Sequence, residues 1–448
     1  MLNIGKGFQI LCRAAACDAF HNSAERYPQP RCHSETRIEM LDDLWNWTSE
    51  EWLPRKFSHR ATGSNSILWL HGPAGAGKSA VAQSLCQKLS ETEGRAFASF
   101  FFKRQHTSRG NGNKMFPTIS YQLAVLHPGL KRAISQNVEN DPSIVDKSLS
   151  IQLLKLIIEP CRQIQSLDSV PMTIIIDGLD ECDGQHIQEE ILRSVGNSMD
   201  DPHLRLRFLI VSRPEPHIAE MFTGPCLDSL HCSLNIEEAF EDVRKYLLDE
   251  FTRVHREHHQ TMGSVPMPWP SAAIVDQLVR KSSGYFIYAS TVIKFIDDKD
   301  FRPTDRLDII MRPAEANVES PFEALDQLYT QILSNVPARP QLLQILSAIV
   351  EFEICVCHIK SLLQLKPGDL RLMLRGLRSV VEVPEEDIYE ELIWHHASFL
   401  DFLKDPARSG IFYPSTFQTH TEVIGYILKA LSYNYDDPSL NQNNPLVL

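Results

Sequence analysis

The sequence predicts an α/β fold, with a parallel β-sheet that is flanked by helices and followed by helical domains. Apolar segments at 67–71, 97–102, 172–177 and 207–211 have the length and the β-branched or aromatic content of buried strands. Segments with apolar residues at helical spacing separate them, which indicates alternating strands and helices. Beyond Cys232 apolar residues recur at three- and four-residue steps, so the remainder is expected to be mainly helical.

The first predicted strand leads into a loop that fits the phosphate-binding pattern GxxxxGKS. Its glycines let the backbone turn tightly, so that successive N–H groups can point at a β-phosphate. Lys78 supplies a positive charge for the phosphates and Ser79 a hydroxyl ligand for Mg²⁺. The helix that follows adds the positive end of its dipole. The predicted nucleotide contacts are Gly72, Pro73, Ala74, Gly75, Ala76, Gly77, Lys78, Ser79 and Ala80.

This loop predicts a P-loop NTPase sheet that binds ATP or ADP with Mg²⁺. No base-reading residue is identifiable, so the sequence does not distinguish ATP from GTP. A glycine- and alanine-rich loop that matches by chance is the alternative, and the strand before the loop and the helix after it argue against that alternative.

A second segment, MTIIIDGLDE, ends a predicted strand with acidic residues. Ligands of open α/β sheets bind at the carboxyl ends of the strands, so Asp177 is expected to orient Mg²⁺, directly or through water. Asp180 or Glu181 could polarise an attacking water. A strand that ends in aspartate is common by itself, and its combination with a phosphate loop is what favours the metal role.

A further predicted strand, at 207–211, is followed by Ser212, Arg213 and Pro214. An arginine at a strand end beside a triphosphate can bind the γ-phosphate, because the guanidinium matches its oxygens bidentately. The alternative is a surface arginine in a salt bridge. With the two neighbouring motifs in place, we interpret Arg213 as a γ-phosphate sensor.

The remaining pattern predicts several domains. We expect helices at 8–20, 36–52, 80–89, 116–126, 130–137, 150–164, 237–250, 272–281, 285–295 and 322–333. Short helices after residue 341, followed by strand-like segments at 380–383 and 389–394, favour a winged-helix-like unit. The expected domains are a helical lead-in (1–60), the nucleotide-binding domain (61–232), a helical lid (233–338), a winged-helix-like domain (339–405) and a C-terminal helix with a polar tail (406–448).

Composition excludes some classes of function. The formal charge of −13 argues against a large nucleic-acid interface. No run of about 18 apolar residues predicts a membrane span, and ten scattered cysteines suit free thiols in a reducing cytoplasm. Two groups offer alternative metal sites, and neither has convincing spacing. They are Cys355 with Cys357 and His358, and His255 with His258 and His259.

The chain resembles the NACHT class of STAND ATPases, most closely the fungal NACHT proteins related to the nephrocystin-type P-loop domain. The resemblance lies in the segments HNSAERYPQPRCHSETRIEML, ILWLHGPAGAGKSAVAQSL, ASFFFKRQ, FPTISYQLA, TIIIDGLDEC, LRFLIVSRPEPHI and SSGYFIYASTVIKFI. It implies that Asp177 is the magnesium aspartate, Asp180 and Glu181 are the hydrolytic acids and Arg213 is the sensor. It also implies that His396, before SFLDF, reaches the β-phosphate of ADP; a histidine that only caps the following helix is the alternative.

The resemblance implies an ATP/ADP-controlled switch with slow hydrolysis, self-association on activation and unidentified effector or sensor partners, in fungal non-self recognition. Such proteins usually carry an effector module upstream and repeats downstream, and no period of 20 to 50 residues is evident in the last hundred positions. A truncated gene model or a bare switch would explain that departure. Two other functions stay open: a nucleotide-binding scaffold without turnover, and a P-loop small-molecule kinase.

Overall fold

The computed structural model divides the chain into two compact units, Met1–Glu237 and Glu238–Leu448, and we describe each by itself. The structure describes residues 5–49, 66–104, 106–164, 171–199, 204–227, 230–236, 238–311, 323–336, 339–352, 354, 356–366, 368–377, 379–382, 392–394 and 396–436.

The first unit is built on a five-stranded parallel sheet with strand order β2-β3-β4-β1-β5. The strands are β1 (Ile67–His71), β2 (Phe97–Phe101), β3 (Met172–Asp177), β4 (Leu206–Ser212) and β5 (His231–Asn235). The parallel α/β sheet predicted from the sequence is therefore confirmed. Strand β5 was not predicted, because its five residues, HCSLN, include only two apolar side chains and no β-branched one.

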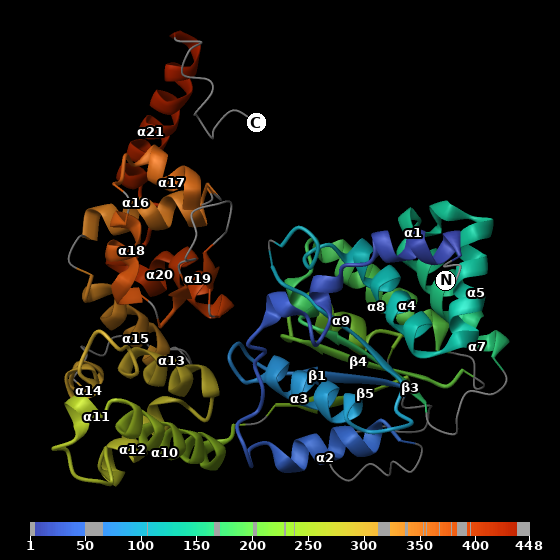
Figure 1. The fold of residues 1–448 in the computed structure, drawn as a ribbon, viewed down its shortest axis with the longest axis horizontal. Coiled ribbons are helices and arrows are strands. Elements are labelled where there is room, and N and C mark those ends of the chain that lie inside the picture. The colour runs from blue at the N-terminus through green and yellow to red at the C-terminus, as the bar shows by residue number, and fades with distance from the viewer. Residues whose placement is uncertain are drawn as a thin grey trace. The chain divides into compact units, whose positions relative to one another are not determined.

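Helices cover both faces of this sheet (Figure 1). Helices α2 and α3 lie on one face, and α1, α4, α5, α8 and α9 lie on the other, where they share a core with β1 to β4. The helices are α1 (Lys6–Ala14), α2 (Ile38–Trp47), α3 (Lys78–Ser90), α4 (Met115–Leu126), α5 (Pro128–Asn140), α6 (Leu149–Leu153), α7 (Glu159–Gln163), α8 (Gln185–Ser198) and α9 (Pro216–Thr223). A π-helical segment, Leu154–Ile158, joins α6 to α7 within the helix predicted at 150–164.

The N-terminal residues pack onto the sheet domain instead of forming a separate body. The Phe8 ring stacks on Tyr121 with centroids 5.4 Å apart, and the Ala16 N–H donates to Thr118 Oγ1 at 2.8 Å. Trp47 is fully buried, and Lys88 lies 4.8 Å above the Trp45 ring. Arg207 of β4 lies 5.6 Å from the Trp47 ring, so both tryptophans of α2 pack against the sheet domain.

The second unit is mainly helical, as predicted. Its helices are α10 (Phe240–Glu257), α11 (His259–Met262), α12 (Ala272–Lys281), α13 (Phe286–Ile296), α14 (Pro303–Met311), α15 (Glu323–Ser334), α16 (Arg339–Val350), α17 (Val356–Leu362), α18 (Asp369–Leu374), α19 (Ala397–Lys404), α20 (Pro406–Ser409) and α21 (Phe417–Asp436). After α18, β6 (Val381–Glu382) pairs antiparallel with β7 (Ile393–Trp394). This is the helix-then-hairpin order expected of a winged-helix-like region.

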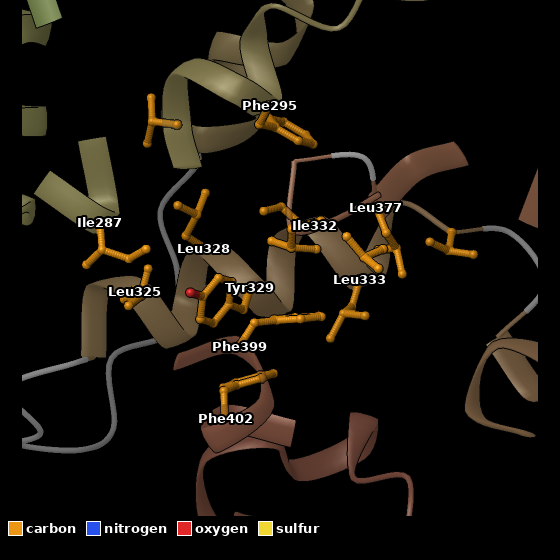
Figure 2. Packing of buried hydrophobic residues seen from close by; sticks show 14 of the residues in the cluster. Ile287, Phe295, Leu325, Leu328, Tyr329, Ile332, Leu333, Leu377, Phe399 and Phe402 are labelled. Atoms are coloured by element: carbon orange, nitrogen blue, oxygen red, sulfur yellow. The ribbon is translucent and has the colours of Figure 1, made fainter. Parts of the chain in front are cut away.

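One continuous core runs through the second unit. Figure 2 shows Tyr329 of α15 packed against Phe399 and Phe402 of α19, with ring centroids 4.9 and 5.4 Å away. The Tyr329 hydroxyl also hydrogen-bonds Ser398 Oγ at 2.8 Å. The predicted boundary between residues 338 and 339 therefore crosses a shared core, and the division into lid and winged-helix-like domains stays a prediction.

Candidate nucleotide-binding site

The loop between β1 and α3 has the backbone geometry of a phosphate cradle. Gly75 and Gly77 have φ angles of 74° and 91°, in the left-handed region that glycine adopts without the strain of a side chain. Gly77 caps the N-terminus of α3, a helix of 13 residues. The N–H groups of its first turn lack partners within the helix, so they and the dipole favour an anion at this end.

Lys78 folds back over this loop. Its Nζ atom donates to the carbonyl oxygens of Gly72 and Pro73, both at 2.8 Å. Burial lowers the Lys78 pKa to about 8, and the charge of Asp180 partly opposes that shift. The ammonium group therefore sits within the loop, where phosphate oxygens can replace the two carbonyls as its acceptors.

Asp177 and Ser79 form the candidate metal site. Asp177 ends β3 and is only 4% exposed, and the Ser79 hydroxyl hydrogen-bonds its carboxylate. Its Oδ1 atom is buried and has no hydrogen-bond partner among the described residues. Such an oxygen suits a cation, and Mg²⁺ prefers one or two carboxylates together with a hydroxyl and phosphate oxygens. These two residues fit Mg²⁺.

Asp180 and Arg213 meet across the ends of β3 and β4. The Arg213 backbone N–H donates to Asp180 Oδ1 at 2.9 Å, and Arg213 Nε lies 3.3 Å from Asp180 Oδ2. The Asp180 side chain is only 3% exposed. The sequence suggested a separate role for each residue, and the structure brings the two together in one ion pair.

Glu181 lies beside this pair in the turn Leu179–Glu181. Burial raises its pKa to about 7, with a further contribution from the negative charge of Asp180. Its Oε2 atom accepts a long hydrogen bond of 3.4 Å from the Arg104 backbone N–H. A carboxyl group with a pKa near neutrality is suited to accept a proton during catalysis.

Two arginines near the site were not predicted as functional. Arg37 is buried, and its Nη2 atom donates to the carbonyl oxygen of Ala76 in the loop at 3.2 Å. Arg26 places its guanidinium 3.6 Å above the Phe101 ring, within electrostatic range of Asp177. Both belong to a segment that the resemblance included, but nothing local in the sequence indicates their folded position.

His396 caps helix α19 in the second unit. Its Nδ1 atom accepts from the Ser398 N–H at 3.0 Å and lies 2.8 Å from Ser398 Oγ. Because Nδ1 accepts an N–H, the neutral ring carries its proton on Nε2. The capping alternative is therefore present in the structure, and a contact between His396 and ADP stays a prediction.

The alternative metal sites gain no support. His255 Nε2 lies 2.9 Å from the Val265 carbonyl oxygen and His258 Nε2 lies 2.9 Å from Asp297 Oδ1, so these rings are engaged elsewhere. Cys355 lies outside the described residues.

Within the described ranges, Asp18, Glu25 and His106 come close enough to share an ion. The His106 ring, however, bridges the two carboxylates through different nitrogens, 2.7 Å from Glu25 and 3.7 Å from Asp18.

Eight cysteines are free thiols in the structure: Cys12, Cys17, Cys32, Cys86, Cys161, Cys182, Cys226 and Cys232. No helix within the described ranges combines the length and the apolar character that crossing a bilayer requires.

A family model described as Nephrocystin 3, N-terminal matches residues 47–213. The match spans the phosphate loop, Asp177 and the Asp180–Arg213 pair, and it supports the nephrocystin-type part of the resemblance. It covers less than half of the chain. No curated protein is a significant match.

Solved structures show low similarity. Cdc6p from Pyrobaculum aerophilum is 14% identical, with 88% of this chain and 95% of that chain covered and a TM-score of 0.33. The Aeropyrum pernix ORC1 protein in complex with DNA is 13% identical, with coverage of 80% and 88% and a TM-score of 0.33. Drosophila ORC bound to DNA is 12% identical, with coverage of 84% and 82% and a TM-score of 0.36. The bound DNA is a property of the ORC1 and Drosophila ORC complexes and is not carried over to this chain.

The burial of Asp177 predicts a pH-dependent stability. Burial raises its pKa to about 6 from an ordinary value of 3.8. Between these values the folded chain binds a proton that the unfolded chain has lost, so stability falls as the pH rises through this window. Without Mg²⁺ or nucleotide, we expect Asp177→Asn to be more stable than wild type at pH 8 by about 1–3 kcal/mol.

That difference should shrink towards zero at pH 4, where the wild-type carboxyl group is protonated. Urea unfolding in EDTA at pH 4, 6 and 8 measures it. Asp146→Asn, at an exposed position, serves as the control. A less stable Asp177→Asn variant at pH 8 would contradict the expectation.

Proposed function

We propose that this chain is a nucleotide-controlled switch of the NACHT and STAND class, which binds ATP or ADP with Mg²⁺ and hydrolyses ATP slowly. One observation carries the proposal: the loop lysine, the loop serine and a buried aspartate with an unpartnered oxygen lie together at the carboxyl edge of the sheet. Edges of this kind bind phosphorylated ligands in open α/β sheets. GTP remains a candidate beside ATP, because no described contact reads a base.

Each residue has a role that its contacts support. Lys78 would exchange the two loop carbonyls for phosphate oxygens, and Ser79 and Asp177 would hold Mg²⁺. Bound Mg²⁺ supplies charge neutralisation at the phosphates. Asp180 is engaged by Arg213, so it acts best by positioning that arginine. Glu181 is the better proton acceptor for a water that attacks the γ-phosphorus and releases ADP and phosphate.

The switch itself needs two states with different nucleotide contacts, because a ligand that binds both states equally shifts neither. We infer that ADP favours a closed state, to which His396 contributes, and that ATP favours self-association and binding of effector or sensor proteins. The remaining features are inferred from composition and the resemblance alone. They are a cytoplasmic setting, no nucleic-acid partner, and a role in fungal non-self recognition and innate immunity.

Nucleotide-dependent self-association tests the switch. We expect multi-angle light scattering to give a monomer with saturating Mg²⁺-ADP and a larger species with a non-hydrolysable ATP analogue. Bound nucleotide is quantified in each sample. An unchanged mass despite bound analogue would contradict the switch and favour a scaffold without turnover, whereas transfer of label from ATP to a small acceptor would favour a kinase.

A further inference from the structure

Two arginines, Arg109 buried and Arg26 partly buried, lie at the end of β2, beside the candidate site. Arg109 is 8% exposed, and its Nε atom donates to the Phe101 carbonyl oxygen at 3.0 Å. Arg26 stacks on the Phe101 ring, and its Nη1 atom donates to Phe20 O and Gln83 Oε1, both at 3.0 Å. In the described part of the chain, no carboxylate lies within ion-pair distance of either guanidinium.

Positive charge without a directly paired anion is costly to bury. Burial lowers the pKa of Arg26 to about 10, although the negative charge of Asp177 opposes this shift, and the neighbouring Arg109 adds repulsion. A buried guanidinium without a paired anion is unfavourable unless a partner arrives from outside the chain. The ligand expected beside Asp177 is polyanionic, so it can supply that partner.

The segment that carries Arg26 is fixed to the phosphate-loop helix. Gln83 Nε2 donates to the His21 carbonyl oxygen at 2.8 Å, and the Cys32 N–H donates to Ser84 Oγ at 3.0 Å. Arg37 contacts the Ala76 carbonyl oxygen within the loop itself. These contacts hold Arg26 at a set position relative to α3 and its loop, and that position lies upstream of the residues that the family model matches.

We propose that Arg26 completes the site from the N-terminal segment by binding the terminal phosphate of a bound triphosphate, so that it contributes to discrimination between ATP and ADP. This inference rests on the proposed function. Asp177 would hold Mg²⁺, which in P-loop enzymes neutralises charge at the terminal phosphates, so this side of the site would face the last phosphate of the nucleotide. A guanidinium there can bind two oxygens of a phosphate group that ADP lacks.

The test compares affinities for a non-hydrolysable ATP analogue and for ADP, both with Mg²⁺, by calorimetric titration of the full chain. Arg26→Met keeps an apolar stem over Phe101 and removes the charge. We expect it to weaken binding of the ATP analogue by about 10- to 100-fold, the range of a lost charge-assisted contact, and to change ADP affinity less than about 3-fold. Arg31→Met, at an exposed position of the same segment, is the matched control and should change neither affinity.

The outcomes separate two failures. If wild type binds neither nucleotide, the proposed function is wrong. If wild type binds both, and Arg26→Met leaves the ratio of the two affinities unchanged, only the role of Arg26 is wrong. Arg26→Lys keeps the positive charge but lacks the planar guanidinium group. It replaces Arg26→Met in the test if the methionine variant does not fold. It should lower the ratio at least about 3-fold, and an unchanged ratio would overturn the inference.

Discussion

Replacing Lys78 by alanine is expected to weaken binding of both ADP and ATP by about 100-fold or more, since the ammonium group would donate to several phosphate oxygens in a buried loop. The variant should still fold. Among the described residues, Lys78 donates to the backbone carbonyls of Gly72 and Pro73 alone, and burial already lowers its pKa to about 8. Its removal therefore relieves a buried charge.

Titration calorimetry with each nucleotide measures this loss, and thermal unfolding checks the fold. Lys88→Ala is the matched control, because Lys88 belongs to the same helix but is 44% exposed and pairs with Asp42 at the surface. It should change nucleotide affinity less than about 2-fold, as surface ion pairs contribute little. Equal affinities of Lys78→Ala and wild type would contradict the assignment of the loop as the phosphate site.

Replacing Glu181 by glutamine is expected to reduce ATP turnover by about 100- to 1,000-fold, the usual effect of removing a general base. Nucleotide affinity should stay within about 3-fold of wild type, because glutamine keeps an oxygen for the Arg104 N–H and similar volume. The separation of turnover from binding distinguishes a catalytic group from a structural one.

Steady-state phosphate release over a range of pH provides the measurement. Wild-type turnover should fall as the pH drops below about 7, where Glu181 becomes protonated, and the glutamine variant should lack that dependence. Glu189→Gln, in the next helix, should behave as wild type. If both wild type and Glu181→Gln show no turnover while binding nucleotide, the scaffold alternative is favoured.

The sequence predicted those parts of the site whose chemistry is local. The glycines, Lys78 and Ser79 stand within eight consecutive residues, and their spacing, with the strand before and the helix after, predicts a phosphate loop. Asp177 was predictable because an apolar run that ends in an acid places the carboxylate at the edge of a parallel sheet. The buried position of Asp177 and its hydrogen bond with Ser79 are consistent with that prediction.

Contacts between distant segments were not predictable. The Asp180–Arg213 pair depends on β3 and β4 being neighbours, which no local pattern shows. Arg26 reaches the site through contacts with α3 and β2, and a single arginine in a polar segment carries no sign of this. Likewise, the core that Tyr329 and Phe399 share joins helices far apart in the chain, and helical periodicity does not show such a contact.

The central claim is that one nucleotide binds at the loop of residues 72–79 with Mg²⁺ held by Ser79 and Asp177. Calorimetric titration of the wild-type chain with ADP, with and without Mg²⁺, tests it most directly. We predict saturable binding of one nucleotide per chain that weakens when Mg²⁺ is removed and is displaced by ATP. A folded chain that, after removal of any co-purified nucleotide, shows no saturable binding of ADP or ATP at millimolar concentration would contradict the claim.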